Sequence, residues 1–141
     1  MTTTSPTDRT IEQILDAGAF LAHAGFVPVH VDGASVRGTL AVGPEQHTPW
    51  GVVHGGVYAT AIESAASIGA TAAVASVGQF AVGVNNSTDF LRSRTEGSFD
   101  VVAEPLFQGR TQQLWQVVIR DPQDDKVIAR GQVRLQNVDP R

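Results

Sequence analysis

The sequence predicts an α+β domain in which a curved antiparallel β-sheet wraps around one long central helix. The helix is expected from about Gly55 to Val77, a stretch built mainly from Ala, Ser, Gly and Thr with few large side chains. Such small residues let other backbone approach closely, which suits a helix enclosed by a sheet. Strand-like runs follow, and the short turn-like links between them favour an antiparallel meander. These runs are Phe80–Leu91, Ser98–Phe107, Gln112–Arg120 and Lys126–Asn137.

The part of the chain before the central helix predicts a shorter helix and a β-hairpin. Apolar residues recur at helical spacing between Thr10, which suits an N-cap, and Gly25, which suits a C-cap. Alternating apolar residues then predict two strands joined by the turn Asp32-Gly33. Residues 1–9 are polar and Thr-rich and are expected to be disordered. The 141 residues suit one domain, which we place at residues 10–138.

Composition excludes several classes of function. The formal net charge of -4 argues against nucleic-acid binding, because such proteins carry a basic patch. The chain has no cysteine, which excludes disulfides, thiolate catalysis and Cys-based metal sites. Charged residues make up only 17% of the chain, so part of its surface is expected to be covered by another copy of itself. No secretory signal pattern or convincing membrane span is present, and the protein is expected to be cytoplasmic, without a membrane partner.

Serine, metal and phosphate-loop chemistry have little support in the sequence. No G-x-S-x-G nucleophile motif is present, and the glycines form neither a P-loop nor a dinucleotide fingerprint. The histidines at positions 23, 30, 47 and 54 lack the paired spacing of zinc ligands. We therefore predict no metal and no organic cofactor, with a site at His47 and His54 as the metal alternative.

The turn that opens the central helix is the better candidate site. Gly55 and Gly56 leave room for a ligand carbonyl to approach the free N–H groups of the helix N-terminus. Glu63 lies on the same helix and is the only charged residue between Glu45 and Asp89, so no charged helix face accounts for it. Ser67 follows one turn later on the same face. The alternatives are that Gly55 and Gly56 only form a tight turn, that Glu63 is an ordinary solvated glutamate, and that Ser67 is a small packing residue.

The spacing of these residues constrains any shared chemistry. Eight residues separate Gly55 from Glu63, which places them about 12 Å apart along a straight helix. A donor and an attacking group at that separation cannot act on one carbonyl. If both belong to a site, Glu63 must meet the Gly55 end of another copy, as two antiparallel helices across a two-fold axis would allow.

The pattern His54-Gly55-Gly56, Glu63 and Ser67 resembles the hotdog-fold acyl-CoA thioesterases. The similarity is greatest to the PaaI-like/4-hydroxybenzoyl-CoA thioesterase (4HBT) branch that uses glutamate, which includes the 1,4-dihydroxy-2-naphthoyl-CoA thioesterases. It covers roughly residues 25–135. The resemblance implies that Glu63 attacks the thioester or activates water, and that the Gly55 N–H polarises the carbonyl, aided by Gly56. It also implies that His54 shapes the turn and that Ser67 supports the attacking group or water.

The same resemblance implies a set of residues that contact the substrate or its CoA arm. They are Thr48, Gly56, Gly83, Phe90, Leu91, Arg92, Ser93, Phe107, Gln108, Gly109, Arg110, Thr111 and Gln112. Guanidinium groups suit phosphate, so Arg92, Arg94 and Arg110 are the candidates for the CoA phosphates, with ordinary surface charge as the alternative for each. Two positions depart from the branch: Thr48 stands where glutamine is frequent, and Phe90 where histidine is frequent.

These observations together predict an acyl-CoA thioesterase with an aromatic-leaning acyl group. We expect a homodimer with shared active sites that pairs further into a homotetramer. The alternatives are a non-catalytic acyl-CoA-binding or regulatory hotdog protein and an enoyl-CoA hydratase, whose His/Asp pair the central helix lacks.

Overall fold

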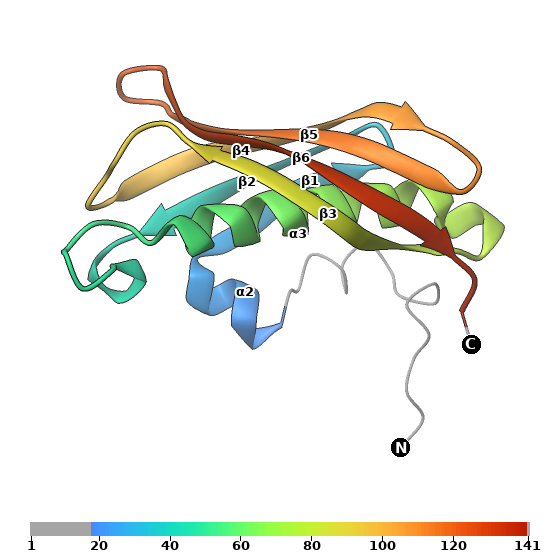
Figure 1. The fold of residues 1–141 in the computed structure, drawn as a ribbon, viewed down its shortest axis with the longest axis horizontal. Coiled ribbons are helices and arrows are strands. Elements are labelled where there is room, and N and C mark those ends of the chain that lie inside the picture. The colour runs from blue at the N-terminus through green and yellow to red at the C-terminus, as the bar shows by residue number, and fades with distance from the viewer. Residues whose placement is uncertain (1–17, 141) are drawn as a thin grey trace.

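The computed structural model describes residues 18–140, which form six strands and a long helix packed against one face of their sheet (Figure 1). The helices are α2 (Ala19–Ala24) and α3 (Gly55–Val74), with short 3-10 turns η2 (Pro44–Gln46) and η3 (Ala75–Val77). The strands are β1 (Phe26–Asp32), β2 (Ser35–Val42), β3 (Phe80–Phe90), β4 (Gly97–Gln108), β5 (Gln112–Asp121) and β6 (Lys126–Val138). The predicted hotdog architecture, an antiparallel sheet around a central helix, is confirmed.

The strand order corrects the expected meander at one point. The sheet runs β1-β2-β4-β5-β6-β3, so β4, β5 and β6 are successive neighbours, whereas β3 pairs with β6 at the far edge. The link between β3 and β4 (residues 91–96) therefore crosses the end of the sheet. Six residues span three strand spacings of about 4.8 Å each with ease. The shortness of this link therefore does not require β3 and β4 to be neighbours in the sheet, as the predicted meander assumed.

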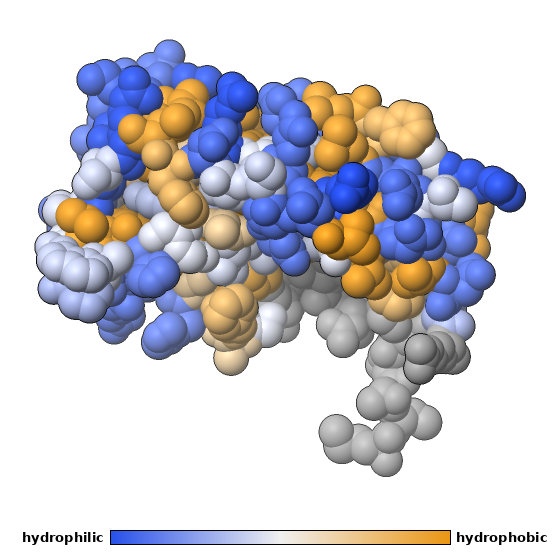
Figure 2. Space-filling view, in the orientation of Figure 1, coloured by the Kyte–Doolittle hydropathy of each residue, from blue (hydrophilic) through white to orange (hydrophobic). Residues whose placement is uncertain are grey.

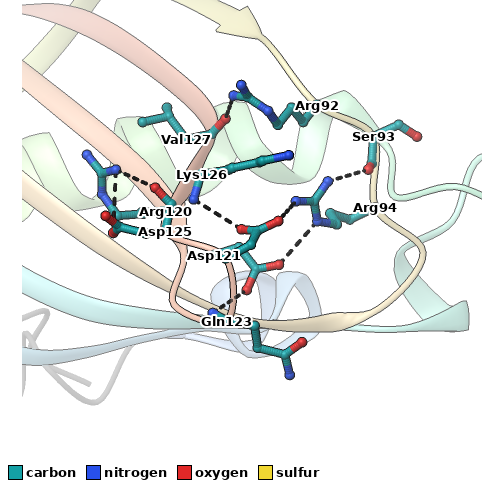
Figure 3. A network of polar contacts seen from close by, with 10 residues as sticks. Arg92, Ser93, Arg94, Arg120, Asp121, Gln123, Asp125, Lys126 and Val127 are labelled. Atoms are coloured by element: carbon teal, nitrogen blue, oxygen red, sulfur yellow. Dashed lines mark hydrogen bonds and ion pairs between the residues drawn. The ribbon is translucent and has the colours of Figure 1, made fainter.

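The crossing link is fixed to the turn between β5 and β6. Arg94 lies 3.1 Å from Asp121 and 2.8 Å from Asp124 across ion pairs (Figure 3). The backbone N–H of Gln123 and the Arg94 guanidinium hold the pKa of Asp121 below its ordinary value. The Arg94 carbonyl also accepts a hydrogen bond from the Val53 N–H at 2.9 Å. These contacts hold the link beside the loop that leads into α3.

The core lies between α3 and the concave face of the sheet. Ala61, Ala65, Ala66 and Ala70 are fully buried, and a Cβ at Gly69 would lie only 2.6 Å from the ring of Trp115. The expectation that small residues admit close neighbours is therefore confirmed.

A buried polar network fixes the C-terminal half of α3. Gln113 donates to the Ala70 carbonyl at 3.0 Å and to Asn137 at 2.8 Å, and it accepts from the Trp115 Nε1–H at 2.9 Å. Because each of these buried groups has a partner, the network aligns α3 on β5 and β6 without leaving an uncompensated polar atom.

Helix α2 packs on the side of α3 that faces away from the sheet (Figure 1). It ends at Gly25, which has the left-handed φ of 90° expected of its C-cap role. The predicted helix start at Thr10 and the predicted disorder of residues 1–9 lie outside the described residues. The stretch Gly55–Val77 is long and apolar enough to cross a membrane, but in this fold it is the helix that packs against the sheet.

Candidate active site

The loop before α3 is a tight turn that orients the start of the helix. The Thr48 N–H donates to the Val52 carbonyl at 2.7 Å, and its hydroxyl accepts from the Trp50 N–H at 3.2 Å. Gly51 has a φ of 80°, a conformation that favours glycine. Thr48 therefore serves the loop itself, and its side chain is already engaged in one hydrogen bond.

His54 is the N-cap of α3. Its Nδ1 accepts the Gly56 N–H at 2.8 Å, so the neutral ring carries its proton on Nε2. A Cβ at Gly56 would lie 2.9 Å from this nitrogen, which explains why glycine stands there. The cap engages the Gly56 N–H, so the aid that we expected from Gly56 falls to Gly55 alone.

The Gly55 N–H is the open donor at the helix N-terminus. Among the described residues it has no hydrogen-bond partner, and it lies at the positive end of a 20-residue helix. The Phe90 ring covers the neighbouring space, since a Cβ at Gly55 would lie 3.0 Å from its Cζ. Phe90 is 56% exposed, so its ring also borders solvent. The arrangement offers a backbone donor beside an apolar ring, which suits a developing oxyanion shielded from water.

Glu63 lies two turns further along α3, on its exposed side facing β3. The Asn86 amide donates to Glu63 Oε1 at 3.2 Å and to the Ala59 carbonyl at 3.2 Å. The Thr88 hydroxyl donates to Asn86 Oδ1 at 2.6 Å, which fixes the orientation of the amide. A Cβ at Gly83 would lie 3.1 Å from Glu63 Oε2, so this glycine leaves room for the carboxylate. The carboxylate is thus held in place but remains open to solvent.

Asn86 is the residue that our sequence reasoning missed. Asparagine is depleted in strands, so Asn85-Asn86 in the middle of a predicted strand was a detectable signal. Ser67 was expected beside Glu63. It lies partly buried on α3, and no hydrogen bond joins the two in the described structure.

The residues expected to contact CoA fall at two ends of the sheet. Leu91, Arg92 and Ser93 follow Phe90 and are exposed, and the Arg92 guanidinium donates to the Val127 carbonyl at 2.7 Å (Figure 3). Arg94 is engaged with Asp121 and Asp124, so it stabilises the loop and is not a free cation for phosphate.

The second set occupies the β4–β5 hairpin, at the opposite end. The Asn137 amide donates to the carbonyls of Gly109 and Arg110 at 3.1 and 3.2 Å and so fixes the turn. The Phe107 ring folds over Gly109, where a Cβ would meet it at 2.7 Å. Gly83 on β3 and Gln113 on β5 both pair with Leu135 of β6. Gly83 therefore lies at the same end of the sheet as this hairpin set, which comprises Phe107, Gln108, Gly109, Arg110, Thr111 and Gln112.

The fold of one chain thus presents two half-sites. One contains His54, Gly55 and Phe90; the other contains Glu63, Gly83 and Asn86. In residues 18–140 no three His, Asp or Glu side chains gather as metal ligands do. A donor for an oxyanion and a positioned carboxylate are the components of acyl transfer.

Comparison with known proteins identifies the family. The family described as "Thioesterase superfamily", 4HBT, matches residues 51–128, which include both half-sites. The chain belongs to the thioesterase superfamily. It is a thioester hydrolase with the hotdog fold of that family.

Individual relatives agree with this assignment. The chain is 52% identical over 118 residues, 82% of each chain, to the Mycobacterium tuberculosis protein named "Putative esterase Rv1847". The structure of that protein has a TM-score of 0.83 with 48% identity, over 88% of this chain and 99% of that one. The proofreading thioesterase EntH of Cronobacter sakazakii is 31% identical over 106 residues, 75% of this chain and 77% of EntH. These thioesterase-superfamily similarities extend across the described fold.

Proposed function

We propose that this thioesterase hydrolyses an acyl-CoA to the free acid and CoA, with an aromatic acyl group preferred. The Gly55 N–H polarises the thioester carbonyl, and Glu63 from a second copy attacks the carbonyl carbon or activates water. The position of Glu63 carries this proposal: the carboxylate stands alone on an otherwise uncharged helix and is held by Asn86. A glutamate that only solvated the surface would need no such support.

The exposed edge of β3 supports a homodimer with shared sites. This strand has 11 residues without proline, and Val82 and Val84 on it are 43% and 53% exposed. Apolar patches interrupt the polar surface on the side of the molecule where β3 lies (Figure 2). An exposed strand edge of this length without proline invites pairing with another strand. Antiparallel pairing of two copies of β3 would set the Glu63 half-site of one against the Phe90 and Gly55 half-site of the other.

A second interface, on the outer face of the sheet, would join two dimers into the homotetramer. Asp100 and Glu104 on β4 point outward, as do Arg130 and Arg134 on β6. A two-fold axis along β5 would place β4 of one copy over β6 of another and bring acids against arginines. This charge complementarity favours association of the outer face with itself.

The proposed substrate follows from the surroundings of the Gly55 donor. The Phe90 ring lies beside it, 3.0 Å from the position of a Cβ at Gly55, so an aromatic acyl group finds a ring partner at its carbonyl end. The exposed Arg92 and Arg110 suit CoA phosphates. A glutamate at position 63 also agrees with the PaaI-like branch, and acyl-CoA as substrate agrees with a cytoplasmic enzyme.

Hydrolysis of an acyl-CoA panel by the wild type and by Glu63→Gln tests the proposal. We expect the wild type to release CoA from benzoyl- and naphthoyl-CoA faster than from aliphatic thioesters. Glu63→Gln keeps the shape of the side chain and should lose at least 100-fold in kcat, on the order of a missing nucleophile or base. Binding without turnover by the wild type would support the regulatory alternative, and full activity of Glu63→Gln would remove Glu63 from the mechanism.

A further inference from the structure

A hollow lies between α2 and the first turns of α3. Its volume is about 360 Å³, and its lining includes His54, Gly56, Val57 and Phe20. This volume falls in the range of small-molecule sites. Because His54 and Gly56 flank Gly55, an acyl group whose carbonyl lies at the Gly55 N–H would begin at this hollow.

A second hollow follows along α3 toward Glu63. Its volume is about 330 Å³, and its lining includes Ala59, Glu63 and Asn86. The two hollows share two lining residues, Phe20 and Thr60. These residues therefore stand at the boundary between the two spaces.

Phe20 is the larger residue at this boundary and is not part of the core. It is 73% exposed on α2, so burial in the fold does not account for an aromatic side chain there. The Thr60 hydroxyl donates to the Gly56 carbonyl at 2.7 Å, so its hydrogen-bonding needs are met within the helix. The boundary thus consists of an aromatic ring above a satisfied helical residue, and an apolar group can lie against it without stranding a polar atom.

We propose that Phe20 determines acyl specificity by closing the first hollow against the second. The acyl group of the bound thioester occupies the first hollow and ends against the Phe20 ring. Removal of that ring joins the two hollows and admits a longer acyl group. This inference rests on the proposed function for the location of the carbonyl, but it concerns binding and does not require turnover.

The affinities of hexanoyl-CoA and decanoyl-CoA test it, measured by isothermal titration calorimetry in the Glu63→Gln background so that the thioesters survive. Each newly buried methylene raises affinity about fourfold. We therefore expect Phe20→Ala to raise the ratio of decanoyl to hexanoyl affinity at least tenfold, and Phe20→Leu to give an intermediate increase. Val77→Ala is the matched control: Val77 is 71% exposed near the other end of α3, and the ratio should stay within twofold.

An unchanged ratio in Phe20→Ala, or an equal change in Val77→Ala, would overturn the inference. Because Phe20 is exposed, both variants should keep the melting temperature, and circular dichroism checks that they fold. Turnover by the otherwise wild-type protein is measured separately. Its absence with a shifted affinity ratio would refute the hydrolase proposal for these substrates and leave the role of Phe20 supported. Failure of every variant to bind either thioester would refute the role of Phe20, and failure to bind benzoyl-CoA as well would also refute the proposed function.

Discussion

Two inactive variants of this enzyme should restore activity when their subunits exchange. Gly55→Val blocks the donor end of the site, because its side chain would fill the space a carbonyl needs beside Gly55. Phe90, whose ring lies 3.0 Å from the position of a Cβ there, is 56% exposed and can move aside, so the fold should persist. Glu63→Gln removes the carboxylate and changes little else. Each variant alone should have less than 1% of wild-type activity.

The expected recovery follows from the geometry of α3. Gly55 and Glu63 are about 12 Å apart along the helix, so each site in the proposed dimer takes one residue from each chain. A mixed dimer then contains one site with both defects and one with neither. After free exchange of equal amounts, about half of the dimers are mixed, and activity should reach about a quarter of the wild-type value per protomer.

Thioester hydrolysis after mixing, with native mass spectrometry to confirm mixed dimers, measures this recovery. A mixture of Glu63→Gln with Glu63→Ala is the control and should stay inactive, because no site in it has a carboxylate. If mixed dimers form and the Gly55→Val mixture remains inactive, the shared site is wrong. Recovery in the control mixture would show that Glu63 is dispensable.

Three further substitutions test the site and the core. Asn86→Ala should lower kcat about tenfold with little change in melting temperature, because Glu63 loses its orienting amide; equal kcat values would contradict this role. Gly69→Ala should reduce the free energy of unfolding by about 1–3 kcal/mol in urea titrations, because the added methyl overlaps the buried Trp115 ring; a more stable variant would show that the ring shifts freely. Burial raises the pKa of Tyr58 to about 12. The neutral phenol therefore contributes about 2–3 kcal/mol to the free energy of unfolding. This contribution is complete below pH 10 and is lost between pH 10 and 12. Tyr58→Phe should remove that alkaline loss of stability in unfolding titrations. Absorbance at 295 nm should report the pKa of this single tyrosine. If the free energy of unfolding changed equally with pH in both proteins, the assignment would be contradicted.

The central helix and the strands could be predicted because their patterns are local. Small residues with Glu63 as the one charge marked α3, and alternation placed β4, β5 and β6 within a residue or two of their bounds. The position of β3 beside β6 could not be predicted, since a six-residue link permits either a hairpin or a crossing. The ladder between β3 and β6 and the ion pairs of Arg94 with a turn far away in the sequence exist only in the second arrangement.

In the candidate site, too, local sequence signals could be predicted, whereas contacts between distant residues could not. Gly55 and Glu63 were detectable because a glycine turn and a lone acid contradict the surrounding pattern. The roles of His54 as a cap and of Asn86 as a support for Glu63 depend on side chains that meet only in the folded chain. Arg94 shows the opposite error: a cation at a strand end suggested phosphate, but two aspartates already neutralise it.

The contacts of α3 change in kind along its length. Its C-terminal half is fixed by the Gln113 network and by the close approach of Gly69 to Trp115, whereas the residues that face the hollows lie in the first two to three turns. A substitution among the exposed residues of these turns alters which molecules fit, while the buried residues Tyr58 and Ile62 of the same turns keep their packing. Variation in ligand preference can therefore accumulate in this lineage at small cost to folding, and the first turns of α3 together with α2 are where we would look for it among relatives.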